Sequence, residues 1–136
     1  MIQPMTGLAQ TLGLELVSAS SDEVVIEWDV TSAHHQPMGI IHGGVHCSVI
    51  ETVCSIGAGI AASQREPGII AVGLENHTSF VRGVGSGRLR AVATPITRGR
   101  RTQVWEATVR DAGGEIVARG TVRLLNVPAE SALRSS

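Results

Sequence analysis

Two adjacent glycines and one isolated acid are the residues of this sequence best suited to chemistry on a carbonyl group. Gly43 and Gly44 open a long apolar segment, and Glu51 lies within it as the only acidic residue between Asp29 and Glu66. If the segment is a helix, the N–H group of Gly43 has no partner within it and points out of its positive end. Glycine there lets a ligand oxygen approach closely, as an oxyanion site requires, although a tight turn into the helix would use the same glycines.

Glu51 is either part of a solvated stripe or held in place as a base. Ser55 follows one turn later on the same helical face, where its hydroxyl could orient the carboxylate or a water molecule. Gly43 and Glu51 are about 12 Å apart along one helix, so they cannot act on one carbonyl from the same chain. If they cooperate, two such helices must lie antiparallel in a symmetric dimer, which then contains two equivalent sites.

The histidines of this segment allow a second interpretation. His42 and His46 are four residues apart, as in helical zinc sites, but the glutamate usual between them is missing and no acidic ligand is apparent. We therefore expect neither a metal nor a cofactor. We predict that His42 hydrogen-bonds near the carbonyl or fixes the loop, and His46 receives no role.

A basic cluster further along the chain suits phosphate recognition. Arg98, Arg100 and Arg101 surround Gly99 and precede Thr102. Guanidinium groups bind phosphate oxygens in a bidentate manner. A solvated basic turn would have the same composition, so the cluster by itself leaves both explanations open.

The remaining pattern predicts an antiparallel sheet with one helix, which is an α+β fold. Strands are expected at 14–17, 24–30, 69–81, 88–97, 102–110 and 115–125, a short helix at 6–12 and a long helix at 45–63. The last four strands are expected to form a meander. Pro95 indicates a bulge or a sheet edge, and residues 111–114 a hairpin turn.

Composition limits the possible partners. The 136 residues, 43% of them hydrophobic, suit one domain, predicted over 1–127 and followed by a flexible tail over 128–136. The net charge of −1 gives no general attraction to nucleic acid or anionic membranes. No secretory signal pattern and no sufficiently long uninterrupted apolar run is found, so a cytoplasmic protein with no membrane partner is expected.

Five residues in register give the sequence a family resemblance. Gln36, His42, Gly43, Glu51 and Ser55 resemble the motif of the hotdog-fold thioesterases, in particular the PaaI-like branch with the Glu type of 4-hydroxybenzoyl-CoA thioesterase. Within that branch the sequence is most similar to 1,4-dihydroxy-2-naphthoyl-CoA hydrolases and enterobactin proofreading thioesterases. The resemblance covers roughly residues 12–127, including the segments 72–75, 99–105 and 111–115.

This resemblance implies a curved antiparallel sheet around one long helix, assembled into dimers and usually tetramers. It implies metal-independent hydrolysis of an aryl- or medium-chain acyl-CoA, for which 1,4-dihydroxy-2-naphthoyl-CoA is one candidate. The Gly43 N–H would polarise the thioester carbonyl, and Glu51 of the facing subunit would act as base or nucleophile. Gln36 and His42 would place the carbonyl or the leaving thiolate, and Ser55 would support Glu51.

The resemblance also assigns CoA recognition. Residues 98–102 would meet the nucleotide phosphates, together with Arg82 from the end of an earlier strand. Relatives often carry a histidine two residues before this arginine, where the present sequence has Phe80, so acyl specificity that depends on such a histidine does not carry over. The alternative function is a sensor or carrier that binds acyl-CoA without turnover. A hotdog dehydratase would use a differently placed His and Asp, and that arrangement is not found.

Overall fold

Apolar residues at helical spacing form the long helix that organises the fold, α2 (Gly43–Arg65). Its inner face is buried along the whole length, from Val45 to Ala62. The small residues of its second half allow close packing, because a Cβ atom on Gly57 would lie 2.4 Å from the Trp105 ring. The thin end of the helix therefore rests on a large aromatic side chain that is itself completely buried.

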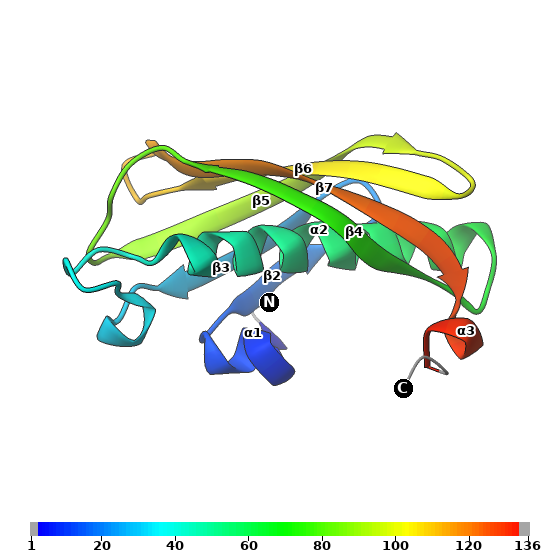
Figure 1. Cartoon of the computed structure of the whole chain (residues 1–136), viewed down its shortest axis with the longest axis horizontal. Coiled ribbons are helices and arrows are strands. Elements are labelled where there is room, and N and C mark those ends of the chain that lie inside the picture. The colour runs from blue at the N-terminus through cyan, green and yellow to red at the C-terminus, as the bar shows by residue number, and fades with distance from the viewer. Residues whose placement is uncertain (1–2, 134–136) are drawn as a thin grey trace.

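The computed structural model describes residues 3–133, and in it the strands form one antiparallel sheet that covers α2 (Figure 1). The strands are β1 (Gln3–Pro4), β2 (Glu15–Ala19), β3 (Val24–Asp29), β4 (Ile69–Phe80), β5 (Arg88–Arg98), β6 (Thr102–Arg110) and β7 (Ile116–Pro128). The short helices are α1 (Gly7–Thr11), the 3-10 turn η1 (Ser32–His34) and α3 (Ala129–Leu133). The predicted α+β architecture is therefore confirmed.

The predicted four-strand meander is wrong in one respect. The strand order is β1-β2-β3-β5-β6-β7-β4, so β5, β6 and β7 follow one another but β4 pairs with β7 at the far edge. The segment between β4 and β5 is not a hairpin, because these two strands do not pair with each other. Its carbonyl groups accept hydrogen bonds from the chain before α2. Val30 N donates to Gly87 O (2.8 Å) and Ile41 N donates to Val84 O (2.8 Å). This segment therefore lies against the loop that leads into α2.

Local features follow the sequence closely. The register between β5 and β6 shifts between Pro95 and Thr97, which is the bulge that proline predicts. Asp111 caps the β6–β7 turn, with its backbone N–H donating to Glu115 O (3.0 Å). Helix α1 confirms the short helix expected before Gly13, which has a φ of +71°.

The segment expected as a flexible tail begins in ordered structure. Pro128 is the last residue of β7, and Ala129–Leu133 form α3, anchored by a hydrogen bond from Ala129 N to Gly68 O (2.9 Å). Residues 134–136 lie outside the described part of the chain.

Helix α2 is also long and apolar enough to meet a length criterion for crossing a membrane. Half of the residues in that window are buried inside the fold. Strands β3 to β7 all pack against it, so α2 is the core helix of the domain.

Candidate active site

The first turn of α2 presents one unpaired backbone donor. The Gly44 N–H donates to His42 Nδ1 (2.7 Å) and the Val45 N–H donates to His42 O (2.9 Å). Among the described residues, no acceptor pairs with the N–H of Gly43. His42 thus caps the helix, and because Nδ1 accepts, its neutral ring carries the hydrogen on Nε2, free for a second contact.

The unpaired N–H lies beside a pocket of about 250 Å³. The pocket is lined by residues from the loop before α2, the first turns of α2, and the end of β4: Gln36, Ile40, Ile41, Gly43, His46, Phe80, Val81, Arg82 and Gly83. The ring of Phe80 packs so closely on Gly43 that an added Cβ atom would lie 2.5 Å from it. Glycine at this position therefore leaves room for the Phe80 ring and opens the helix end to a ligand.

Gln36 is held in this wall by a turn. Its side-chain oxygen accepts from Met38 N, and its backbone oxygen accepts from Gly39 N (3.0 Å). Gly39 has a φ of +81°, which favours glycine. With its oxygen engaged in the loop, the amide group of Gln36 keeps N–H donors for a substrate.

Glu51 lies in a different pocket, of about 290 Å³. This pocket is lined by Leu8, Cys47, Ser48, Glu51, Thr52 and Asn76, and it shares no residue with the pocket of Gly43. The carboxylate sits against β4, where a Cβ atom on Gly73 would lie 3.8 Å from Glu51 Cδ. Glu51 is exposed in the single chain, so the apolar residues around it in the sequence do not bury it.

Sequence reasoning missed the polar residues that surround Glu51. Asn76 Nδ2 donates to Cys47 O (2.9 Å), one turn before Glu51, and the Thr78 hydroxyl donates to Asn76 Oδ1 (2.6 Å). Asn76 lies in the polar second half of β4, residues 75–79, so no local pattern singled it out. Ser55, in contrast, does not line this pocket, and within residues 3–133 it makes no hydrogen bond to Glu51.

His46 is the second site residue that the sequence left without a role. It is 2% exposed and packs near Phe80, with 6.2 Å between the ring centroids. Burial lowers the pKa of His46 to about 4, so its ring is neutral at physiological pH. Within residues 3–133, no three His, Cys, Asp or Glu side chains are grouped as metal ligands.

The arginines assigned to CoA phosphates divide into two groups. Arg82 lines the Gly43 pocket and forms an ion pair with Asp111 of the β6–β7 turn. A backbone hydrogen bond from Glu115 and the nearby Arg82 lower the pKa of Asp111 against the opposing effect of desolvation. Residues 98–102 form the β5–β6 turn. This turn lies at the opposite end of β6 from Asp111, about 25 Å from it by strand rise.

Within that turn the side chains differ in their partners. Arg98 donates to Asp22 Oδ1 (2.9 Å) and to Ser21 O (2.8 Å). Arg100 and Arg101 are exposed, and no hydrogen bond or ion pair of their guanidinium groups is found in the described part of the chain. The backbone of the turn is held by β7, since Asn126 N donates to Arg101 O (2.8 Å).

An antiparallel sheet folded over one long central helix is the hotdog fold, and the thioesterase superfamily model matches residues 38–118. The Mycobacterium tuberculosis protein Rv1847 is 39% identical over 118 residues, covering 87% of this chain and 84% of the relative. The 1,4-dihydroxy-2-naphthoyl-CoA hydrolase of Listeria monocytogenes is 39% identical over 105 residues, covering 77% of this chain and 83% of the relative.

Solved structures agree with the sequence matches. Rv1847 superposes with a TM-score of 0.84 at 38% identity, covering 89% of this chain and 96% of its own. Thioesterase HI1161 of Haemophilus influenzae superposes with a TM-score of 0.82 at 30% identity, covering 89% and 82%. The chain belongs to the thioesterase superfamily and is a thioester hydrolase.

Proposed function

We propose that this protein hydrolyses acyl-CoA thioesters in active sites that two chains build together. The observation that carries this proposal is the separation of two functional groups on α2. The Gly43 N–H and the Glu51 carboxylate open into pockets that share no residue. A second chain with its α2 antiparallel would bring its Glu51 to the first chain's Gly43, and by symmetry the reverse.

In the proposed reaction, the thioester oxygen accepts a hydrogen bond from the Gly43 N–H, and the helix dipole stabilises the charge that develops on it. Glu51 of the other chain then removes a proton from an attacking water, or attacks the carbonyl carbon itself. The C–S bond breaks, and the CoA thiolate leaves and takes up a proton. If water is the nucleophile, the free acid forms directly; if Glu51 is the nucleophile, a mixed anhydride forms first, and water then hydrolyses it to the free acid and restores the Glu51 carboxylate. His42, through Nε2–H, and Gln36, through its amide, donate to the carbonyl or the thiolate.

Ser55 keeps a supporting role in the proposal. It lies one turn after Glu51 on the same helical face. In the single chain it makes no contact with the carboxylate, so its support for Glu51 would come in the assembled dimer.

The position of the basic turn also fits a shared site. Within one chain, residues 98–102 lie at the far end of α2, about 30 Å from Gly43 by helical rise. In an antiparallel dimer the partner's Glu51 faces this chain's Gly43. From that Glu51 to the end of the partner's α2, where the partner's residues 98–102 lie, the distance is only about 20 Å. We propose that Arg98, Gly99, Arg100, Arg101 and Thr102 of the partner meet the CoA phosphates, while Arg82 acts close to the thioester.

Exposed apolar side chains support a homodimer. Leu8, Met38, Leu74, Phe80 and Val81 lie around α2 and along β4, whose outer edge has no neighbouring strand in the described chain. An open edge with apolar residues favours pairing with a second copy. We propose a homodimer that assembles further into a homotetramer in the cytoplasm.

The pocket beside Gly43, called the acyl pocket from here on, suits an aryl or medium-chain acyl group. Its walls include Ile40, Ile41, Phe80 and Val81, which suit a small apolar body. The named activity of the Listeria relative makes 1,4-dihydroxy-2-naphthoyl-CoA a candidate substrate.

Thiol release from benzoyl-, hydroxynaphthoyl-, hexanoyl- and palmitoyl-CoA, by wild type and Glu51→Ala, tests the activity. Turnover by the wild type and its loss in the variant are expected. Binding of all four esters without turnover would favour a sensor or carrier.

Mixed dimers test the sharing of the site. Glu51→Ala and Gly43→Pro chains are each expected to be inactive, since proline lacks the N–H but is tolerated at the first helical position. After unfolding and refolding together, half of the dimers are mixed, and each has one intact site. Recovery of about a quarter of wild-type activity is expected from this symmetry, whereas no recovery would place both groups in one chain's site.

A further inference from the structure

Among the described residues, two side chains have buried nitrogen atoms without a hydrogen-bond partner, Trp28 and His46, and of these only His46 lines the pocket of Gly43. It is 2% exposed, and both ring nitrogens are buried without a hydrogen-bond partner. Gln103, which is equally buried, donates to Ala58 O (2.9 Å) and accepts from Trp105 Nε1 (2.8 Å). Because buried polar groups are normally paired, a completely unpaired imidazole points to a partner that binds from outside the chain.

The position of His46 directs it to the acyl pocket. It lines that pocket together with Gly43 and Gln36. It follows Gly43 by three residues, which is nearly one helical turn, and helical side chains lean toward the helix N-terminus. The imidazole therefore lies over the turn that would hold the thioester carbonyl, and within reach of the acyl group attached to it.

The protonation state of the ring limits what it can bind. Burial lowers its pKa to about 4, so the ring is neutral and has one N–H donor and one acceptor nitrogen. A hydroxyl group also offers one donor and at least one acceptor, and it suits this ring better than a carboxylate, which only accepts. Among residues 3–133, Arg82 is the one charged side chain that lines the pocket.

Phe80 is the exposed side chain whose movement could give access to His46. Its ring is 57% exposed, and its centroid lies 6.2 Å from that of His46. Phe80 is also the last residue of an edge strand. Rotation of this exposed side chain toward solvent would uncover the imidazole without disturbing the core.

We propose that His46 is a specificity-determining residue that hydrogen-bonds a hydroxyl group on the acyl part of the substrate, while the apolar walls hold its body. The inference rests on the proposed thioesterase function. It predicts that the enzyme prefers hydroxylated aryl thioesters over the same thioesters without the hydroxyl, and that His46 causes the preference.

The test compares kcat/KM for benzoyl-CoA and its 2-, 3- and 4-hydroxy derivatives in the wild type, His46→Leu and His46→Gln. Arg90→Met is the control, because Arg90 belongs to β5 and lines neither the pocket of Gly43 nor that of Glu51. The wild type should prefer at least one hydroxy derivative by about 10- to 100-fold, as expected when a site pairs a substrate hydroxyl. His46→Leu should lose the preference, read as the ratio of kcat/KM for each hydroxy derivative to that for benzoyl-CoA in the same variant, and its thermal unfolding curve shows that it folds. His46→Gln, which keeps a donor and an acceptor, should retain part of it.

An unchanged preference in His46→Leu would overturn the inference, as would a wild type that shows none. Binding of inert phenacyl-CoA thioethers, with and without a ring hydroxyl, separates this inference from the proposed hydrolysis. If no ester is turned over but the hydroxyl strengthens thioether binding only when His46 is present, the hydrolysis proposal fails and the role of His46 stands. If His46 has no effect on either measurement, its role is wrong whatever the activity.

Discussion

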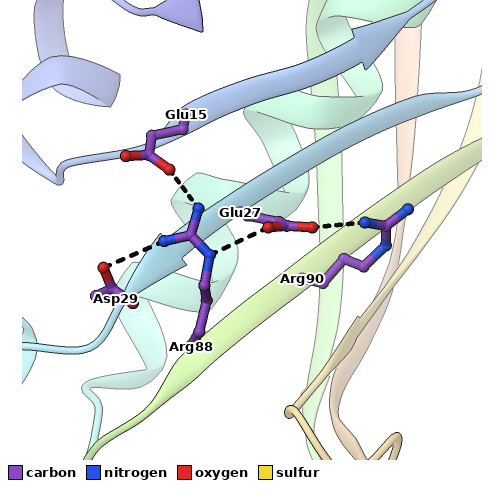
Figure 2. A network of polar contacts seen from close by, with 5 residues as sticks. All are labelled: Glu15, Glu27, Asp29, Arg88 and Arg90. Carbon is purple, nitrogen blue, oxygen red and sulfur yellow. Dashed lines mark hydrogen bonds and ion pairs between the residues drawn. The ribbon is translucent and has the colours of Figure 1, made fainter. Parts of the chain in front are cut away.

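Polar groups have partners on the outer face of the sheet, whereas several polar atoms at the start of α2 have none. On the sheet, Arg88 of β5 contacts three carboxylates from neighbouring strands, Glu15, Glu27 and Asp29, as Figure 2 shows. Arg90 adds a second cation to Glu27 at 2.5 Å. Every charged group in this network has at least one partner of opposite sign.

The start of α2 leaves three polar atoms unpaired. The Gly43 N–H and both nitrogens of His46 have no partner among residues 3–133. Exposure does not explain the difference, since His46 is far more buried than Arg88, whose side chain is 34% exposed.

The titration behaviour of the two regions differs in the same sense. Burial would raise the pKa of Glu27, but hydrogen bonds from Arg88 and Arg90 outweigh it and hold that pKa below its ordinary value. Hydrogen bonds that Arg88 donates to Glu15 and Glu27 raise the pKa of Arg88. The network thus stabilises charged forms, whereas the pocket holds His46 neutral. Paired charges indicate a structural role. Burial without a partner indicates a ligand site only where the group also lines a pocket, as His46 does and the core residue Trp28 does not.

The largest expected effect comes from removing the unpaired N–H. Gly43→Pro should lower kcat by about 10²- to 10³-fold, as loss of an oxyanion donor does in other hydrolases. His42 has φ −69° and ψ 135°, an extended conformation that suits the residue before proline. Gly43→Ala is the control, since it keeps the N–H and only displaces the exposed Phe80 ring. Steady-state kinetics should show a much smaller loss in Gly43→Ala, and equal losses would mean that crowding, not the donor, matters.

The second effect is on stability at mildly acidic pH. The folded-state pKa of His46 is about 4, below its ordinary value near 6.5. The unfolded chain therefore takes up a proton that the folded chain does not, and stability falls as pH drops from the unfolded value toward the folded one. From about pH 7 to about pH 5, His46 should contribute a loss of about 2 kcal/mol.

Urea unfolding of the wild type and His46→Leu at both pH values measures this loss. The variant should lack that part of the pH dependence. Identical pH profiles would show that His46 finds a partner in solution, and the contrast between the two regions would then disappear.

A smaller effect is expected from the charge network. Arg88→Met leaves Glu15, Glu27 and Asp29 without their shared cation and should reduce the free energy of unfolding by about 1–2 kcal/mol, because several partly exposed ion pairs are lost together. The kcat should not change, since the network lies outside both pockets. Arg90→Met, which removes one ion pair only, should cost less. A fall in kcat with unchanged stability would reverse the assignment of a structural role.

The smallest effect is expected in the basic turn, residues 98–102, where some side chains also have partners and others have none. Arg98 is paired with Asp22, whereas Arg101 has no partner in the described part of the chain. Arg101→Ala should raise KM for CoA esters by about 3- to 10-fold, consistent with one lost charge-assisted contact, and should leave KM for pantetheine esters unchanged. Arg98→Ala should also raise KM for CoA esters, and it should lower the melting temperature more than Arg101→Ala does, because it loses the ion pair with Asp22 as well. An equal rise of KM for both ester types in Arg101→Ala would remove phosphate contact from its role.

Much of the fold could be predicted from the sequence, because its local signals agree with one another. The 3.6-residue spacing around Val49 and Val53 and the alternation from Val24 to Trp28 gave the type of each element, and Pro95 marked its bulge. The position of β4 beside β7 could not be predicted in this way. Strand order depends on which edges are free and on where α2 lies, and no local pattern records this.

For the candidate site, the sequence by itself determined the groups that the proposed reaction uses: Gly43 at a helix start, Glu51 two turns later, and a spacing too long for one chain to use both. Only the tertiary structure decided that Glu51 is exposed, that Asn76 rather than Ser55 is its neighbour, and that His46 is buried without a partner. The physical reason is that spacing along a helix is fixed by covalent geometry, whereas burial and pairing depend on which distant strand packs over each residue.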